Sequence, residues 1–345
     1  MTTKKLITLA ATAAVLGALA YVSSNTKKLK TPSLTGKPVL TALDVSDVQR
    51  IEVSDNGQKT LMLEGTDTGW IVTSLFGYPA DITKTRANLL ALHDLKIGQV
   101  ATGKTLGPAQ VVDLQNATGK SLATLRLGEM HMREATGQMA MYGGGAYPDG
   151  RYVATGADTV YLVTDPLTAF DGDPKRWVDT LIAAVPAAQI QAIEITAGGE
   201  RLTLEKKDGA WTLDDLPDGE ELDPAKLRGL ESALAQLHLT DLADPALTPE
   251  QLGMATGAVY KATLTGGEIY AATLGDATPA GRHLRLRAYA PAGDAPAPAV
   301  DAFNARAANW NYIIPAHAAA NMTSRRADLV KPKEEPQPEN PGTDE

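Results

Sequence analysis

Residues 98–105 have the spacing of a phosphate-binding loop. Gly98, Gly103, Lys104 and Thr105 satisfy the pattern G-x-x-x-x-G-K-T, in which backbone amides and the lysine hold the phosphates of a nucleotide. That mechanism requires a strand before the loop and a helix directly after it. Here a leucine-rich helix is predicted before the loop, and Gly107-Pro108 interrupts any helix after it. We therefore expect an ordinary loop that follows a helix, and no cofactor.

The histidines do not form a convincing metal site. His131 and Glu134 are three residues apart, but metal ligation needs at least a third donor. Residues 128–137 are expected to form a loop between strands and not one face of a helix. The remaining histidines are separated from one another along the chain: His93, His238, His283 and His317. The sequence predicts no bound metal.

Two acidic clusters could in principle bind calcium. Residues 171–173 and 214–221 are rich in carboxylates, but neither follows the alternating spacing of a calcium loop. Pro174 and Pro217 favour turns at both places. No residue is predicted to be catalytic, although a Ser-His-Asp triad or a carboxylate pair assembled in space stays open. The sequence favours a non-enzymatic protein.

A tyrosine-flanked glycine run is the candidate contact surface. Tyr142 and Tyr147 enclose three glycines and an alanine, and Pro148 follows. Exposed tyrosines on a loop are typical of partner contacts. The alternative is a flexible hairpin tip without a partner.

The tryptophans indicate that the chain contains one unit twice. Trp70 and Trp211 are 141 residues apart, and Trp177 and Trp310 are 133 apart. Shorter matches accompany these pairs, because V-x-x-I-E-V at 48–53 resembles I-x-x-I-E-I at 190–195. In a chain with only 5% aromatic residues, paired tryptophans are expected to be core residues that anchor each copy.

The predicted elements have the same order in both copies. Short alternating strands at 48–53, 60–64 and 70–73 are separated by turn residues, and a helix capped by Asp81 should follow. Asp223 should cap the matching helix, which extends to Leu237. More short strands then follow in each copy. We predict an α+β fold made of two tandem, mainly antiparallel sheet units with one packed helix each, preceded by an N-terminal hydrophobic helix.

The expected organisation has five parts. Residues 1–30 form a signal peptide or single-span membrane anchor, 40–170 the first copy and 171–188 an inter-repeat linker. Residues 189–330 form the second copy, and the proline-rich residues 331–345 a disordered tail.

The N-terminus predicts export. Lys4 and Lys5 precede an uncharged run from Leu6 to Val22, and Ala18-Leu19-Ala20 resembles a signal cleavage site. The run would be roughly 26 Å long as a helix, against about 30 Å for a bilayer core. A cleaved signal and a retained anchor both stay open. In either case we expect most of the chain on the periplasmic side of the envelope.

Composition excludes several classes of protein. A net charge of −9 disfavours a nucleic-acid partner. The absence of cysteine excludes disulfides and a lipid-modified N-terminal cysteine. An apolar content of 43% is enough to form a core in each of two domains.

The ordered set of short motifs resembles a known family. A lysine-flanked apolar N-terminus is followed by the V-x-x-I-E-V strand, a Leu-x-Leu-Glu and Trp hairpin, Gly77-Tyr78-Pro79-Ala80-Asp81 at a helix start, and a Leu-Gly turn. This order resembles the bacterial domain-of-unknown-function 4340 family over roughly residues 40–330 in two copies. The resemblance implies an envelope-anchored auxiliary component encoded beside gliding-motility-type ABC transport systems. It implies no catalytic residues.

Two functions are therefore compared. The first is a non-enzymatic envelope protein that binds or scaffolds a membrane partner, such as ABC transporter subunits, with membrane attachment if the N-terminal segment is uncleaved. The alternative is a periplasmic glycan-binding protein or glycan hydrolase, in which exposed Trp and Tyr would stack on sugars. Buried tryptophans would disfavour the glycan function.

Overall fold

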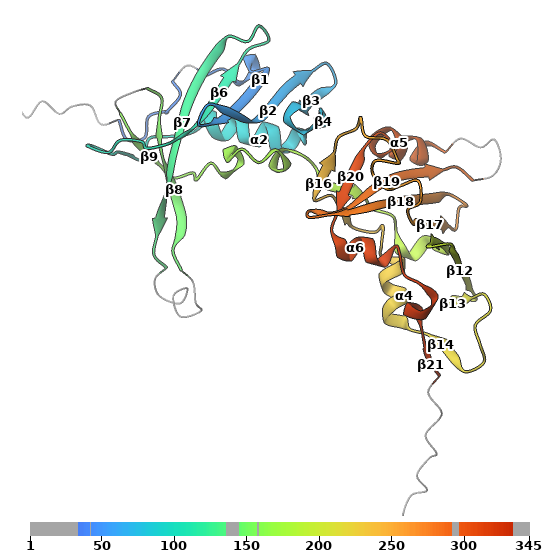
Figure 1. Cartoon of the computed structure of the whole chain (residues 1–345). Helices are drawn as coiled ribbons and strands as arrows, with labels where there is room; N and C mark the ends of the chain where they lie inside the picture. Colours follow the sequence, from blue (N-terminus) through green and yellow to red (C-terminus); the bar gives the residue numbers. More distant parts are fainter. Residues whose placement is uncertain (1–33, 42, 136–144, 157–158, 292–296, 334–345) are drawn as a thin grey trace, which may run out of the picture. The chain divides into compact units, whose positions relative to one another are not determined.

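The protein is mostly antiparallel β-sheet with a few helices, as predicted for an α+β fold (Figure 1). The computed structural model describes residues 34–41, 43–135, 145–156, 159–291 and 297–333. By its contacts the chain divides into two compact units. The first contains Met1–Gln49, Val53–Gln58 and Asn88–Asp171, and the second contains Arg50–Glu52, Lys59–Ala87 and Gly172–Glu345.

Both ends predicted from the sequence fall largely outside the described residues. The predicted signal or anchor at 1–30 lies outside them, as do residues 334–345 of the predicted tail. Val330–Pro332, which includes the first two tail residues, is strand β21. Within residues 34–333, wherever the structure describes them, no helix is long and apolar enough to cross a bilayer.

The described strands before residue 164 form a nine-stranded sheet. Its order is β4-β3-β2-β1-β6-β7-β8-β9-β5. Side chains alternate along β1, so that Ile51 and Val53 are buried, and Asn56 and Gly57 have the positive φ values of a tight hairpin turn. The bounds are β1 Arg50–Asp55, β2 Gln58–Thr66, β3 Gly69–Val72, β4 Tyr78–Pro79, β5 Gln99–Val100, β6 Gln110–Gln115, β7 Ser121–Arg133, β8 Tyr147–Ala154 and β9 Tyr161–Val163.

An eight-stranded sheet belongs to the second unit. Its order is β13-β12-β11-β17-β18-β19-β20-β16. The bounds are β11 Ile190–Ala197, β12 Glu200–Lys207, β13 Ala210–Leu213, β16 Asp241–Ala243, β17 Val259–Leu264, β18 Ile269–Thr278, β19 Gly281–Tyr289 and β20 Asn311–Ile314. Two small pairs accompany it: β10 Leu181–Ala183 with β15 Leu237–His238, and β14 Glu220–Leu222 with β21.

The two predicted helices begin at the predicted caps. Asp81 Oδ1 accepts from the backbone N–H of Thr83 at 2.9 Å, and helix α2 covers Ile82–His93. Asp223 caps α4 in the same way, but α4 covers only Pro224–Glu231. The prediction of a helix to Leu237 was wrong. Ser232 Oγ donates to the carbonyl of Arg228 at 2.7 Å, a local bond that competes with helix continuation.

Three helices follow in the second unit. They are α5 Pro298–Ala307, α6 Ala316–Asn321 and α7 Arg326–Leu329. The side-chain amide of Asn304 in α5 makes two hydrogen bonds to the backbone of Ala288 in β19. Its Oδ1 accepts from the Ala288 N–H at 2.8 Å, and its Nδ2 donates to the Ala288 carbonyl at 2.8 Å. Five 3₁₀ turns complete the described elements: η1 Val45–Asp47, η2 Thr73–Leu75, η3 Thr168–Phe170, η4 Pro174–Trp177 and η5 Ala187–Gln189.

The segment predicted as an inter-repeat linker is packed. Trp177 is fully buried, and its carbonyl accepts from the N–H of Asp81 at 2.8 Å within the second unit. Val178, Ile182 and Val185 are buried as well. Residues 172–188 therefore contribute to the core of that unit.

Candidate functional site

The phosphate-loop pattern is not followed by a helix. After β5 the chain passes through Gly103 at φ 77° and continues into strand β6 at Gln110. Lys104 Nζ lies 2.6 Å from Glu129 Oε1 and 3.8 Å from the ring centroid of Tyr152. Its hydrogen bond to Glu129 raises the pKa of Lys104. The lysine therefore has partners within its own unit, and the loop lacks the helix N-terminus that a phosphate site needs.

The acidic clusters and the histidines serve local structure. Asp173 Oδ1 accepts from the N–H of Lys175 at 3.0 Å, and the carbonyls of Asp214 and Asp215 accept from Arg326. His238 Nδ1 lies 3.0 Å from Thr180 Oγ1. In the part of the chain that the structure describes, no group of three or more His, Cys, Asp or Glu could hold a metal.

The four tryptophans differ in burial. Trp177 is fully buried, whereas Trp70, Trp211 and Trp310 are half-buried. Trp211 Nε1 donates to Glu231 Oε1 at 2.7 Å, and Lys206 Nζ lies 4.9 Å from the indole centroid. Within the second unit Trp310 packs edge-on against Tyr78, with ring centroids 4.8 Å apart. One indole of the four is buried and three are half-buried, so the burial of the tryptophans does not separate the glycan function from the scaffold function.

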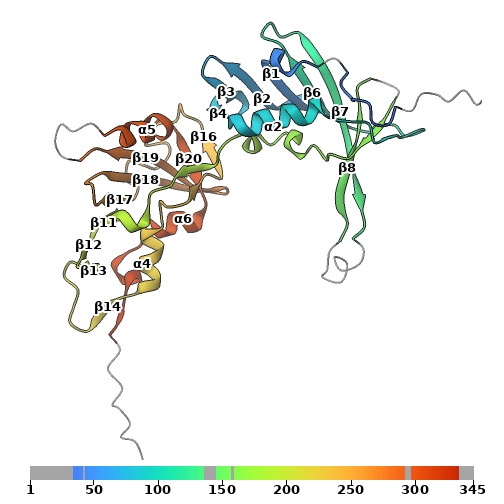
Figure 2. The ribbon, with the colours of Figure 1, turned by 180° about the vertical axis from the view of Figure 1, so that it is seen from behind.

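The clearest projecting feature is a two-stranded ribbon. Residues 130–133 of β7 pair with residues 147–151 of β8, from Met130 opposite Arg151 to Arg133 opposite Tyr147. β6 pairs with β7 only up to Leu127, and β9 pairs with β8 only at 151–153. Among the described residues, 130–133 and 147–150 therefore pair with each other alone, and we call these residues the ribbon. Figures 1 and 2, which view the molecule from opposite sides, both show the ribbon extending beyond its sheet.

The ribbon corrects one sequence prediction. Residues 128–137 were expected to form a loop, but β7 continues through Arg133. The sequence after Met130 did not indicate a partner strand. Pairing with β8 holds these residues in an extended conformation. Tyr147, a predicted contact residue, lies on the ribbon, whereas Tyr142 lies outside the described residues.

The ribbon exposes apolar side chains beside an ionic cluster. Met132 is 50% exposed and Tyr147 is 38% exposed. Asp149 accepts from His131 Nδ1 at 2.5 Å and contacts Arg133 Nε at 2.6 Å. The hydrogen bond to His131 lowers the pKa of Asp149, and Arg133 adds to this shift. Isolated two-stranded ribbons are marginally stable in water, so this cluster stabilises the exposed strands.

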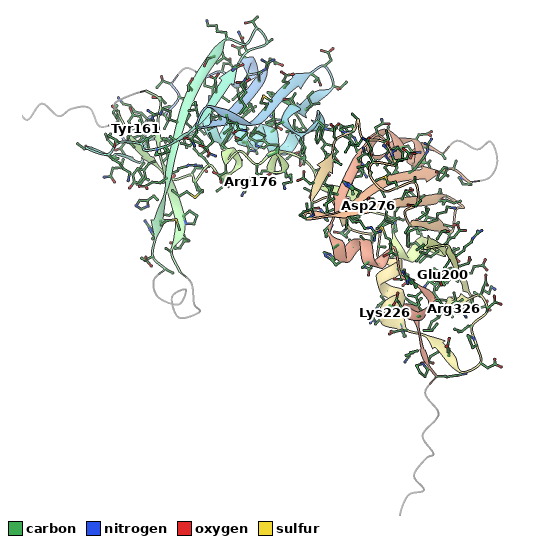
Figure 3. The ribbon with its side chains drawn as sticks, in the orientation of Figure 1. Tyr161, Arg176, Glu200, Lys226, Asp276 and Arg326 are labelled. Atoms are coloured by element: carbon green, nitrogen blue, oxygen red, sulfur yellow. The ribbon has the colours of Figure 1, made fainter. Side chains whose placement is uncertain are left out.

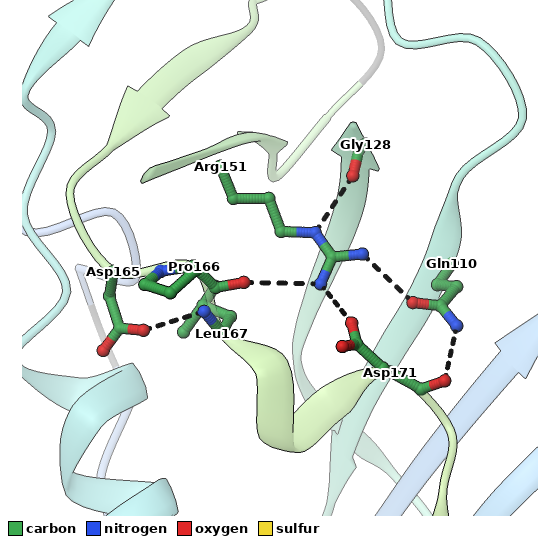
Figure 4. Close-up of polar contacts among 7 residues, drawn as sticks. All are labelled: Gln110, Gly128, Arg151, Asp165, Pro166, Leu167 and Asp171. Carbon is green, nitrogen blue, oxygen red and sulfur yellow. Dashed lines mark hydrogen bonds and ion pairs between the residues drawn. The ribbon is translucent and has the colours of Figure 1, made fainter. Parts of the chain in front are cut away.

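A buried arginine fixes the base of the ribbon (Figure 4). Arg151 is 6% exposed, and its Nε donates to the carbonyl of Gly128 at 2.9 Å. Nη1 lies 2.7 Å from Asp171 Oδ1, and Nη2 donates to Gln110 Oε1 at 3.2 Å. Gln110 Nε2 in turn donates to the carbonyl of Asp171 at 2.9 Å.

A turn completes the surroundings of this arginine. Asp165 Oδ1 accepts from the N–H of Leu167 at 2.7 Å, and the intervening carbonyl of Pro166 lies 3.5 Å from Arg151 Nη1. A buried charge is tolerated when it is paired and its remaining donors are satisfied. The base of the ribbon is therefore held by buried polar contacts, while Met132 and Tyr147 in its outer part are exposed.

Sequence reasoning missed Arg151 and Asp149, and it considered Asp171 only as part of an acidic cluster. The contacts of these residues join positions 18 to 23 residues apart, beyond the reach of local patterns. One signal was available: each Leu-Gly pair, at 127–128 and 274–275, is followed by a strand that contains an arginine. The spacing between glycine and arginine differs, which concealed the correspondence.

Comparison with known proteins gives one match. The sequence model of the family described as Domain of unknown function (DUF4340) matches residues 70–256. No curated protein and no solved structure matches the chain. Because the matched region is more than half of the 345 residues, the chain belongs to the DUF4340 family.

Proposed function

We propose that this protein is a non-enzymatic component of the bacterial cell envelope that binds a membrane partner through the ribbon. The observation that carries the proposal is the combination of a buried, hydrogen-bonded arginine at the base, Arg151, with exposed Met132 and Tyr147 further out. Methionine and tyrosine are enriched at the centres of protein interfaces. Methionine adapts its flexible side chain to the partner, and tyrosine presents a large ring with few rotatable bonds. A pre-ordered ribbon also reduces the cost of binding.

The proposed location rests on the N-terminal sequence. Lys4, Lys5 and the apolar run from Leu6 to Val22 fit a signal peptide or an anchor on the periplasmic side. The partner that we propose is a subunit of an ABC-type transport system, for which the protein would act as an auxiliary component. The resemblance to the DUF4340 family supports this partner, and the model of that family matches residues 70–256.

We propose further that the chain contains two tandem copies of one unit. The strand order β3-β2-β1-β6-β7-β8-β9-β5 corresponds, position by position, to β13-β12-β11-β17-β18-β19-β20-β16. A helix that begins after a capping aspartate lies in the chain between β3 and β5 in the first series, and between β13 and β16 in the second. A doubled module would offer one copy for attachment and the other for a second contact.

Affinity capture from detergent-solubilised membranes tests the proposed function. We expect transporter subunits to co-purify with the full chain and to be lost with the double variant Met132→Ser, Tyr147→Ser. The control is Tyr289→Ser, because Tyr289 is 48% exposed but lies on β19. Equal recovery with the ribbon variant would overturn the role of the ribbon. Recovery of glycan fragments in place of membrane proteins would favour the alternative.

A further inference from the structure

A second arginine, Arg282, occupies the same type of position as Arg151. In β7, residues 128–129 form a bulge between the pairs Leu127 with Val153 and Met130 with Arg151. In β18 an equivalent bulge lies between the pairs Leu274 with Leu284 and Ala277 with Arg282. Arg282 Nε donates to the carbonyl of Gly275 at 2.7 Å, just as Arg151 Nε donates to Gly128.

The two arginines differ at their terminal nitrogens. Those of Arg151 are bound by the carboxylate of Asp171, the amide oxygen of Gln110 and a carbonyl. Arg282 has no acceptor for its terminal nitrogens among the residues that the structure describes. The Nε–H of this guanidinium is bound to the carbonyl of Gly275, and the four remaining N–H donors lie on its outer edge, where they suit an oxyanion.

Arg282 lines a polar cavity of about 280 Å³ in the second unit. Arg325, Thr256 and Thr323 line it as well, together with Asp276. Figure 3 marks Asp276 and also Arg326, which lines a neighbouring cavity that shares Arg325. Arg325 makes no ion pair with any described residue, so two cationic side chains line this space. The Thr323 hydroxyl donates to the carbonyl of Ala319 at 3.2 Å, which leaves the Thr256 hydroxyl as a donor for a ligand.

Tight backbone packing forms part of the wall. A Cβ atom on Gly257 would collide with the carbonyl oxygen of Leu274, and one on Gly275 would collide with that of Leu252. Glycine at these two positions allows the strands to approach closely and leaves the cavity open. The cavity is therefore shaped by the backbone and not by mobile side chains alone.

We propose that this cavity binds an oxyanion, a phosphate or a carboxylate, of a small molecule that carries a neighbouring hydroxyl or amino group. Arg282 and Arg325 bind the oxyanion, and Thr256 donates from its hydroxyl. Asp276 accepts from the neighbouring hydroxyl or amino group. The lining carries one more positive than negative charge in a chain whose net charge is −9, so the cavity is locally selective for anions.

Titration calorimetry of the full chain in detergent tests the proposal. The probes are inorganic phosphate, glycerol 3-phosphate and lactate. Comparing glycerol 3-phosphate with lactate distinguishes a phosphate ligand from a carboxylate ligand, and comparing it with inorganic phosphate shows whether a neighbouring hydroxyl adds affinity. We expect saturable binding of at least one probe, and glycerol 3-phosphate to bind more tightly than inorganic phosphate. Absence of binding by all three would overturn the proposal.

Three variants identify the residues. Arg282→Gln and Arg325→Gln should each weaken binding by about tenfold or more, since each removes a charge-assisted hydrogen bond. Arg325 is exposed, so Arg325→Gln should fold normally. This variant keeps the proposal testable if Arg282→Gln fails to fold. Asp276→Asn should strengthen binding of inorganic phosphate and reduce the preference for glycerol 3-phosphate. The control, Arg287→Gln in β19, should bind as the unaltered chain does; an equal loss there would indicate non-specific charge attraction and refute the site.

Discussion

Arg151 Nε donates to the carbonyl oxygen of Gly128 across the bulge at which β7 leaves its sheet. This contact joins the two strands of the ribbon at its base. The remaining donors of Arg151 bind groups from β6 and from the end of the first unit. The contacts that hold the base of the ribbon therefore come from residues that are distant in sequence.

Asp171→Asn should destabilise the first unit strongly. It removes the carboxylate that pairs with Arg151 and leaves a buried guanidinium without its counter-charge, which costs about 3–5 kcal/mol. Urea unfolding of the variant measures the change. The control is Glu129→Gln, because Glu129 is 70% exposed and pairs with Lys104 at the surface, where an ion pair contributes about 0–1 kcal/mol. Equal losses in both variants would contradict the importance of the buried pair.

The stability of the ribbon should depend on pH through Asp149. The hydrogen bond from His131 lowers the pKa of Asp149 in the folded protein below its ordinary value of 3.8. A carboxyl with a depressed folded pKa contributes stability above its unfolded pKa, and this is lost as the pH falls through the folded pKa. Hydrogen exchange of ribbon amides between about pH 2 and pH 5, referred to the intrinsic exchange rate at each pH, should reveal the loss.

Asp149→Asn should remove this pH dependence. If the variant and the unaltered chain lose ribbon protection in parallel as the pH falls, the pair with His131 does not stabilise the ribbon.

Gly150→Ala should disturb the junction between β8 and β9. A Cβ atom at Gly150 would collide with the carbonyl oxygen of Val163, so the strands must separate at a cost of about 1–3 kcal/mol. Gly156→Ala is a matched control, because no atom lies near a Cβ at that position. Thermal unfolding of the two variants compares them. Equal melting temperatures would show that the junction adapts without cost.

The tryptophans should differ in their effect on stability. Trp177→Ala empties a fully buried site and should cost about 3–5 kcal/mol. Trp211→Phe keeps a ring but removes the donor to Glu231, which should cost about 1 kcal/mol. Denaturant midpoints measure both changes, and a larger loss for Trp211→Phe would reverse the order derived from burial.

Local sequence patterns predicted the parts of the fold that depend on neighbouring residues. The hairpin turn at Asn56-Gly57 and the caps at Asp81 and Asp223 were predictable because backbone conformation and capping are short-range. The length of β7 was not, because residues 128–133 are held extended by strand pairing.

The candidate site was less predictable than the fold. Tyr147 was singled out by its glycine-rich surroundings, but Met132 is opposite Pro148 only because of the register between β7 and β8. The cavity at Arg282 combines residues between positions 197 and 325. Proximity of that kind follows from sheet topology, which a single sequence does not specify residue by residue.

The side-chain amide of Asn304 substitutes for a neighbouring strand. By satisfying both backbone groups of Ala288, it closes this stretch of β19 to strand addition by another chain. A second copy of the chain therefore cannot pair a strand with β19 at Ala288. A partner that extends this sheet would have to pair with β13 or β16, its outermost strands.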